Sequence, residues 1–178
     1  MRKSLFLTAG ILLFLGAMSV SAQSISNYSG DWKLDTAKSE LGERARIKSM
    51  TMNVSQTDKE LTYERKAERE APPEGGGGRG MGGGRGPGGG EPGAMTFSLD
   101  GKETKAEMPR GEAKLKAKTE NGKLKLTTER SFEGPMGSIS LTTVEIWELS
   151  SDGNTLTVSS ETKTPRGDQK QKLVFTKG

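Results

Sequence analysis

Tyr63 and Arg65 are the two side chains whose chemistry and spacing most clearly suggest a binding role. They lie two residues apart in a run that includes apolar Leu61, so in a β-strand all three side chains point to the same face. This spacing would place a phenol and a guanidinium among apolar groups inside the fold. Two other roles remain open for Arg65, because it could pair with Glu145 or extend along apolar surface with its charge in water. Trp147 lies near Glu145 in another predicted strand, and it is either a core residue or a ligand contact.

The residue types that most enzymes use are missing from the chain. It has no histidine and no cysteine, which excludes a Ser-His-Asp triad, a thiol nucleophile and the usual zinc site. Paired carboxylates could still act as they do in glycosidases. However, most acidic residues fall at outward positions or in turns, where a solvated role is expected; examples are Glu64, Glu68, Glu103, Glu120 and Asp152. We therefore expect no catalytic residue, no metal site and no cofactor.

Short runs of alternating apolar and polar residues extend over most of the chain and predict β-strands. The positions that share a face within each run are Trp32 and Leu34; Met50, Met52 and Val54; Leu61, Tyr63, Arg65 and Ala67; Met95, Phe97 and Leu99; Leu115, Ala117 and Thr119; Leu124, Leu126, Thr128 and Phe132; Leu156 and Val158; and Leu173 and Phe175. Asp100-Gly101, Asn121-Gly122 and Asp152-Gly153-Asn154 predict turns between them, because these residues tolerate positive φ. The last of these could also be read as a calcium loop, but without further spaced acids it is more simply a hairpin turn.

Two segments depart from simple alternation. From Ile139 to Leu149 apolar residues occupy both parities, which predicts either a β-bulge near Thr142-Thr143 or burial on both faces. Residues 36–41 could hold a helix of one or two turns that ends at Gly42.

The hairpin spacing predicts an all-β fold, an antiparallel meander of about 8–10 strands that forms a barrel or a half-barrel. Such a sheet hides its edges and offers an inner face for a core or a ligand. Along several strands the inward residues become polar, as from Leu126 to Thr128 and Arg130, and at Ser160 and Thr162. This change fits a cup that holds a small amphipathic ligand. It fits a small core with frayed strand ends equally well.

Residues 1–22 have the pattern of a secretion signal. Arg2 and Lys3 precede an apolar run, and Val20-Ser21-Ala22 predicts cleavage between Ala22 and Gln23. The run is short for a membrane span of about 20 residues, although an uncleaved anchor helix is the alternative. With no cysteine to acylate, we expect a soluble mature domain, residues 23–178, without a stable membrane anchor, in the periplasm or outside a bacterium. Removing the two cations lowers the formal net charge from +4 to about +2.

Residues 72–93 are rich in glycine and include Arg79, Met81 and Arg85. Arginine segments of this type can bind RNA, but only two arginines and no aromatic residue are present here. No Gly-Lys-Ser/Thr sequence follows, which excludes a nucleotide-binding loop. Such a composition cannot bury enough apolar surface to offset its ordering entropy. We therefore predict a disordered, flexible loop inside the domain and no nucleic-acid partner.

The stretch Ser29-Gly30-Asp31-Trp32-Lys33-Leu34-Asp35 resembles the first strand of the calycin superfamily, in which lipocalins and fatty-acid-binding proteins begin with a glycine, one residue and a tryptophan. Together with Lys38-Ser39 and Leu41-Gly42, it is similar to small secreted bacterial lipocalin-like proteins of unknown function. We interpret Trp32 as a plug at the narrow end of a barrel, because a large flat ring can fill that space and fix the strand register. Gly30 would let another group approach closely.

Fatty-acid-binding proteins hold a ligand carboxylate with an inward arginine and tyrosine two residues apart, and Tyr63 and Arg65 are similar to that pair in chemistry. The order and the strand differ, and the sequence shows no pattern for the C-terminal helix of lipocalins or for the helix pair of fatty-acid-binding proteins.

These patterns lead to two hypotheses about function. The first is a secreted or periplasmic, non-enzymatic protein that binds or carries a small hydrophobic or amphipathic molecule, with Tyr63, Arg65 and Trp147 as candidate contacts. The alternative is a structural or protein-interaction module of the cell envelope. An open inner space of about 300 Å³ or more would favour the first and a filled interior the second. The sequence does not specify the oligomeric state.

Overall fold

The computed structural model describes residues 25–42, 46–70, 93–108, 111–134, 137–165 and 167–178. The signal sequence predicted at 1–22 and all but the last residue of the loop predicted at 72–93 lie outside these ranges. Within them the chain forms ten strands and no helix: β1 (Gly30–Leu34), β2 (Ile47–Gln56), β3 (Glu60–Arg69), β4 (Met95–Ser98), β5 (Thr104–Glu107), β6 (Glu112–Glu120), β7 (Lys123–Gly134), β8 (Gly137–Leu149), β9 (Thr155–Thr164) and β10 (Gly167–Lys177). No segment of this described part is a helix that could cross a membrane.

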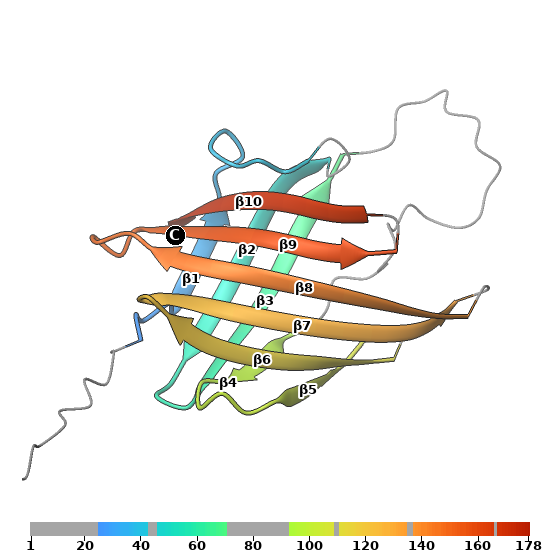
Figure 1. Cartoon of the computed structure of the whole chain (residues 1–178). Coiled ribbons are helices and arrows are strands. Elements are labelled where there is room, and N and C mark those ends of the chain that lie inside the picture. Colours follow the sequence, from blue (N-terminus) through green and yellow to red (C-terminus); the bar gives the residue numbers. More distant parts are fainter. Residues whose placement is uncertain (1–24, 43–45, 71–92, 109–110, 135–136, 166) are drawn as a thin grey trace, which may run out of the picture.

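The strands form one antiparallel sheet that curls into a nearly closed barrel. Their order is β4-β3-β2-β1-β10-β9-β8-β7-β6-β5, so strands that follow each other in sequence pair, except β4 with β5, and β1 pairs with β10. In Figure 1, β5 to β10 form a front layer, and β1 to β4 cross behind it at a steep angle. The terminal strands β4 and β5 meet without backbone pairing, and a hydrogen bond from Thr104 Oγ1 to the Thr96 carbonyl, 2.6 Å long, bridges them. The predicted all-β meander is therefore confirmed.

The strands form where the alternation placed them, and the alternate side chains fill the interior. Along β6, Ala113, Leu115 and Ala117 are buried while the lysines between them are exposed. Asn121 and Gly122 adopt positive φ, 52° and 75°, and join β6 to β7 by the predicted tight turn. The resulting core contains two tryptophans and most of the apolar residues of the domain.

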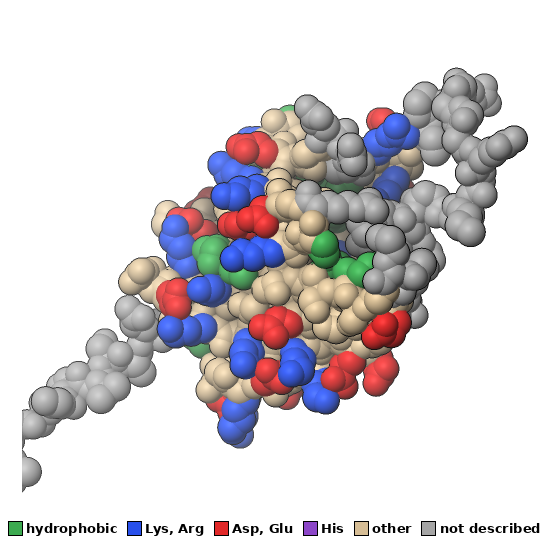
Figure 2. All heavy atoms as spheres, turned by 45° about the vertical axis from the view of Figure 1, so that its right-hand side comes forward, with side chains coloured by type: hydrophobic (Ala, Val, Ile, Leu, Met, Phe, Trp, Pro, Cys, Tyr) green, Lys and Arg blue, Asp and Glu red, His purple; other side chains and the backbone are tan. Residues whose placement is uncertain are grey.

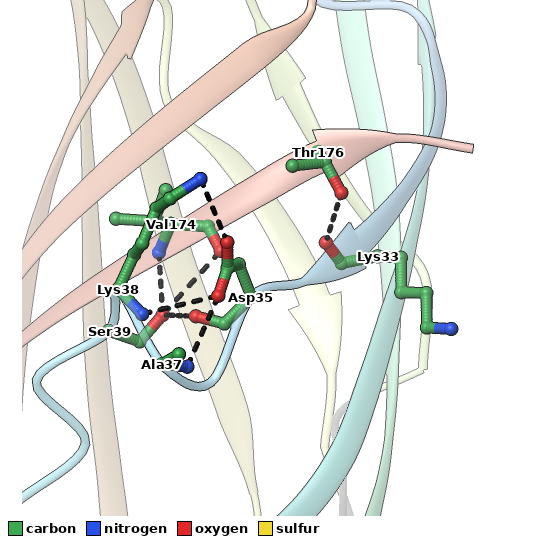
Figure 3. Close-up of polar contacts among 7 residues, drawn as sticks. All are labelled: Lys33, Asp35, Ala37, Lys38, Ser39, Val174 and Thr176. Atoms are coloured by element: carbon green, nitrogen blue, oxygen red, sulfur yellow. Dashed lines mark hydrogen bonds and ion pairs between the residues drawn. The ribbon is translucent and has the colours of Figure 1, made fainter.

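The helix predicted at 36–41 is wrong. Asp35 forms a turn there, because its carboxylate accepts hydrogen bonds from the backbone N–H groups of Ala37 and Lys38. The Ser39 hydroxyl donates to the Asp35 carbonyl and accepts from the backbone N–H of Val174 on β10. Figure 3 shows how this turn fastens the chain after β1 to β10. Local hydrogen bonds of this kind compete with a helix that is too short to stabilise itself.

The bulge predicted near Thr142-Thr143 is also wrong, because β8 keeps one register with β7 and with β9 along its whole paired length. Val144 and Ile146 lie on the outer face, where both side chains are only partly buried, so the alternative of burial on both faces holds only in part. The one register shift in the described sheet lies between Ile47 and Ser49, in β2.

Candidate functional site

An ion pair lies in the interior of the barrel and joins opposite parts of the sheet. Arg65 on β3 binds the Glu145 carboxylate on β8 through two hydrogen bonds, Nη1 to Oε1 at 2.7 Å and Nη2 to Oε2 at 3.0 Å. The side chains are 18% and 9% exposed, so water screens the pair weakly. Arg65 therefore pairs with Glu145, which was one of the alternatives that its sequence pattern left open.

Aromatic rings surround this pair on the side of the core. The Trp147 indole N–H donates to Glu145 Oε2 at 2.9 Å. The Arg65 guanidinium carbon lies 4.7 Å from the centre of the Tyr63 ring and 5.8 Å from that of Trp147, distances at which cations are attracted to aromatic faces. The two rings are 5.1 Å apart. The structure thus brings the three sequence-predicted residues, Tyr63, Arg65 and Trp147, together around Glu145.

The ionisation of these groups follows from their contacts. Burial by itself raises the pKa of Glu145, but the charge and hydrogen bonds of Arg65, together with the bond from Trp147, outweigh burial and lower it. Burial opposes the charge of Arg65, yet Glu145 raises its pKa above the ordinary value. Burial and the nearby carboxylate raise the pKa of Tyr63. At neutral pH the site holds a charged but internally neutral pair beside a protonated phenol.

The inner face changes character at the level of Glu145. Toward the turns 121–122 and 150–154, at the left of Figure 1, the inward side chains are sealed from water, including Leu124, Trp147 and Val158 at 0–1% exposure. In the opposite direction several inward residues of β7 to β10 are polar and partly exposed, although Leu141 among them is apolar and buried. The polar ones are Thr128, Thr143, Ser160, Thr162 and Gln171, which we call the polar wall. Because these side chains point inward and are still partly exposed, solvent reaches the inside of the barrel at this end.

The polar wall is a connected surface rather than a set of frayed ends. Ser160 pairs in register with Glu145 and with Gln171, so the wall begins beside the ion pair. One step further out, the hydroxyls of Thr143 and Thr162 are hydrogen-bonded at 2.9 Å. Across the barrel the same end contains apolar Ile47 and Met50, which pack partly buried against the core. The combination gives an amphipathic inner surface.

Gly30 and Trp32 belong to the sealed end. Trp32 is 1% exposed, its indole N–H donates to the Tyr28 carbonyl at 2.9 Å, and the Lys177 ammonium lies 5.6 Å from its ring. A Cβ on Gly30 would approach the Lys177 side chain to 3.0 Å. The missing side chain therefore leaves room for Lys177 to extend toward Trp32.

Tyr28 covers this same end, and the sequence patterns did not identify it. It is 1% exposed, its hydroxyl donates to the Trp147 carbonyl at 3.3 Å, and its backbone N–H donates to Gln56 Oε1 at 2.9 Å. Tyr28 precedes β1 and belongs to no alternating run, so periodicity could not indicate it. Lys177 was missed as well, because the residue that it contacts, Trp32, lies at the opposite end of the sequence.

The outer wall carries two open hollows, of about 470 Å³ over β1 to β3 and about 500 Å³ over β6 and β7. Both are lined chiefly by outward-facing polar residues, and neither contacts the ion pair. Acidic and basic side chains alternate over the face seen in Figure 2. In the described part of the chain, no group of three acidic side chains is placed to hold a metal ion.

Comparison with solved structures identifies similar folds. The chain is similar to an abundant heat-soluble (SAHS) protein from Ramazzottius varieornatus, with a TM-score of 0.51, 13% identity, and coverage of 84% of this chain and 94% of that one. It is equally similar to the zebrafish ileal bile-acid-binding protein in complex with cholic acid, with a TM-score of 0.51, 16% identity, and coverage of 85% and 98%. No family model and no curated protein matches the sequence. What these likenesses show is the fold, a ten-stranded barrel of lipocalin-like type.

Proposed function

We propose that this chain is a non-enzymatic binding protein that holds a small amphipathic molecule inside the barrel, against the polar wall. The observation that carries the proposal is the inner face itself, which changes at Glu145 from sealed apolar packing to partly exposed hydroxyls and amides. A protein that needed its interior only as a core would gain by sealing both ends, because each exposed inward position forgoes apolar burial.

The ion pair forms the floor of this binding site. Arg65 donates a hydrogen bond to each carboxylate oxygen of Glu145, and Trp147 donates a second one to Oε2. A ligand would meet the pair, the Thr143–Thr162 hydroxyls and the apolar side chains Ile47 and Met50. Pockets of this type combine mainly apolar lining with a few placed polar groups. The zebrafish neighbour was solved with cholic acid, an amphipathic acid, which supports a ligand of this class.

The proposal includes export to the periplasm or the cell exterior. It rests on the charged, apolar and small-residue pattern of residues 1–22. Detection of a mature chain that begins at Gln23, by mass spectrometry of the protein from a periplasmic extract, is the expected result.

Adjacent residues on β9 provide a direct test. Thr162 points inward and Lys163 points outward. We expect N-phenyl-1-naphthylamine, an uncharged fluorescent apolar probe, to bind the native protein. Thr162→Trp should fill the inner space and abolish this binding, while Lys163→Trp should preserve it. Circular dichroism checks that both variants are folded. Equal binding by the two variants, or no binding by the native protein, would contradict the proposal.

The alternative is a structural or protein-interaction module of the envelope, for which the unpaired edges of β4 and β5 are the favourable observation. Exposed edges are templates for pairing with another chain. Mass spectrometry of molecules that co-purify with the protein, combined with light scattering, separates the two functions. A bound amphiphile on a monomer supports the binding protein, and a dimer without any bound species supports the alternative.

A further inference from the structure

Arg130 is an inward-facing arginine beyond the polar wall. Unlike Arg65, it has no acidic partner among the described residues. It lies two residues past Thr128 on β7, where it pairs in register with Ala113 on β6 and Leu141 on β8. The side chain is partly buried, and its Nε atom is buried without a hydrogen-bond partner. None of the acidic residues in the described ranges pairs with it, whereas Arg65 is fully paired with Glu145.

An unpaired N–H of this kind is costly. Most buried polar atoms in proteins have partners, and a buried donor left without one costs about 1–3 kcal/mol. A bound molecule that supplies the missing acceptor would remove this cost. Lysines on the outer wall have acidic neighbours of their own, for example Lys105 with Glu112 at 2.9 Å and Lys123 with Glu148 at 2.7 Å. Arg130 is thus an inward cation for which the described residues offer no counter-charge.

The surroundings of Arg130 suit an anion attached to an apolar body. A guanidinium donates two parallel hydrogen bonds to a carboxylate, sulfonate or phosphate. Its in-register neighbours Ala113 and Leu141 are apolar and offer no competing acceptor side chain. Thr128 and the Thr143–Thr162 hydroxyls follow immediately deeper in the barrel. An anionic group at Arg130 would therefore leave the rest of an amphiphile to extend along the polar wall toward Met50.

We propose that Arg130 is the residue that selects anionic amphiphiles, by binding the negatively charged group of the ligand at the outer end of the polar wall. This inference rests on the proposed function and adds the charge class of the ligand. It assigns the anion to Arg130 rather than to Arg65, because an anion at Arg65 would have to displace Glu145 and leave that carboxylate buried without its partner. Such a displacement is strongly unfavourable.

The test uses two probes that share an anilinonaphthalene frame. 1-Anilinonaphthalene-8-sulfonate has an anionic sulfonate, and N-phenyl-1-naphthylamine lacks it. Fluorescence titration of the native protein should show binding of both. Arg130→Gln should weaken sulfonate binding about tenfold or more, the loss expected for one charge-assisted contact, and should leave the uncharged probe unaffected. Arg130→Lys, which keeps the charge, should retain most of the sulfonate affinity.

Lys163→Gln is the control variant, because it removes the same charge from the outer face of β9; both probes should bind it as they bind the native protein. Unchanged sulfonate binding by Arg130→Gln would overturn the inference. An equal loss of both probes by a variant that circular dichroism shows to be folded would also overturn it, because Arg130 would then not discriminate by charge. If the native protein binds the uncharged probe inside the barrel but does not respond to Arg130, the inference fails and the proposed function stands. If the native protein binds neither probe, the proposed function fails first.

Discussion

At the scale of single residues, the central feature is the buried ion pair of Arg65 and Glu145. Both groups lose their hydration on folding, a cost that can exceed the mutual attraction of a buried pair, so we expect the pair to add more to the specificity of the arrangement than to stability. Their hydrogen bonds and the bond from Trp147 fix three side chains from two strands at the level where the inner face becomes polar. The pair therefore defines the floor of the candidate site.

This account predicts a non-additive effect on stability. Glu145→Gln leaves the Arg65 charge buried without a counter-charge and should lower the free energy of unfolding by about 3–5 kcal/mol. Adding Arg65→Met removes the isolated charge, while the glutamine oxygen can still accept from Trp147, so the double variant should recover most of the loss. Urea denaturation monitored by tryptophan fluorescence measures both values.

The exposed pair of Lys118 and Glu120 provides the comparison, since Glu120→Gln should leave the unfolding midpoint unchanged. If the double variant at Arg65 and Glu145 is as unstable as the single one, then the isolated charge is not the source of the loss.

Gly30 allows a second prediction at this scale. Its φ is +140°, a conformation that side chains other than glycine rarely adopt. Gly30→Ala should therefore lower the free energy of unfolding by about 1–3 kcal/mol. The close approach to Lys177 is a contact with a flexible side chain, so adding Lys177→Ala should restore little of the loss. Full restoration by the second substitution would instead assign the cost to crowding rather than to the backbone.

At the scale of elements, the sequence predicted what periodicity and turn chemistry determine. The period of two placed Tyr63 and Arg65 on one face, and the Asn121-Gly122 turn was predicted because both residues accept positive φ. The helix at 36–41 was wrong because the side-chain hydrogen bonds of Asp35 and Ser39 decide that segment. Periodicity does not tell whether such side-chain hydrogen bonds or the backbone hydrogen bonds of a helix will prevail.

The candidate site could be predicted only in part, for a related reason. Arg65 and Glu145 are separated by 80 residues, and their pairing depends on how the two layers of the sheet face each other. Alternation assigns each residue to a face, but it does not say which residue lies opposite across the barrel interior. Tyr28 lies outside the strands, so its place in the core could be identified only from the folded structure.

The seam between β4 and β5 is the weakest contact between neighbouring strands, because no backbone ladder joins them. We expect Thr104→Val, which removes the hydrogen bond to the Thr96 carbonyl, to raise amide hydrogen exchange of residues 95–98 several-fold. Amide hydrogen exchange in the central part of β8 should not change, since β8 is hydrogen-bonded to β7 on one side and to β9 on the other. Unaltered exchange in β4 would show that the seam is held by its side-chain packing alone.

At the scale of the whole molecule, the two ends of the barrel interior differ in packing and polarity. One end is filled by large apolar side chains, among them Trp32, Phe97 and Trp147, and supplies the stability of a chain without disulfides. The other end gives up part of that burial and presents to its interior hydroxyls, an amide and Arg130, for which the described residues offer no acidic partner. Under the proposed function, the packed end supports the domain and the polar end receives the ligand.

The most direct test of this account is an amide NMR titration of the native protein with cholate, a soluble amphipathic anion. The account predicts that chemical-shift changes concentrate at inward positions around the polar wall, above all at Thr128, Thr143, Ser160 and Thr162, with Arg130 at their outer end. Changes confined to the outward-facing residues of the hollows over β1 to β3 or β6 and β7, or no changes at all, would contradict it.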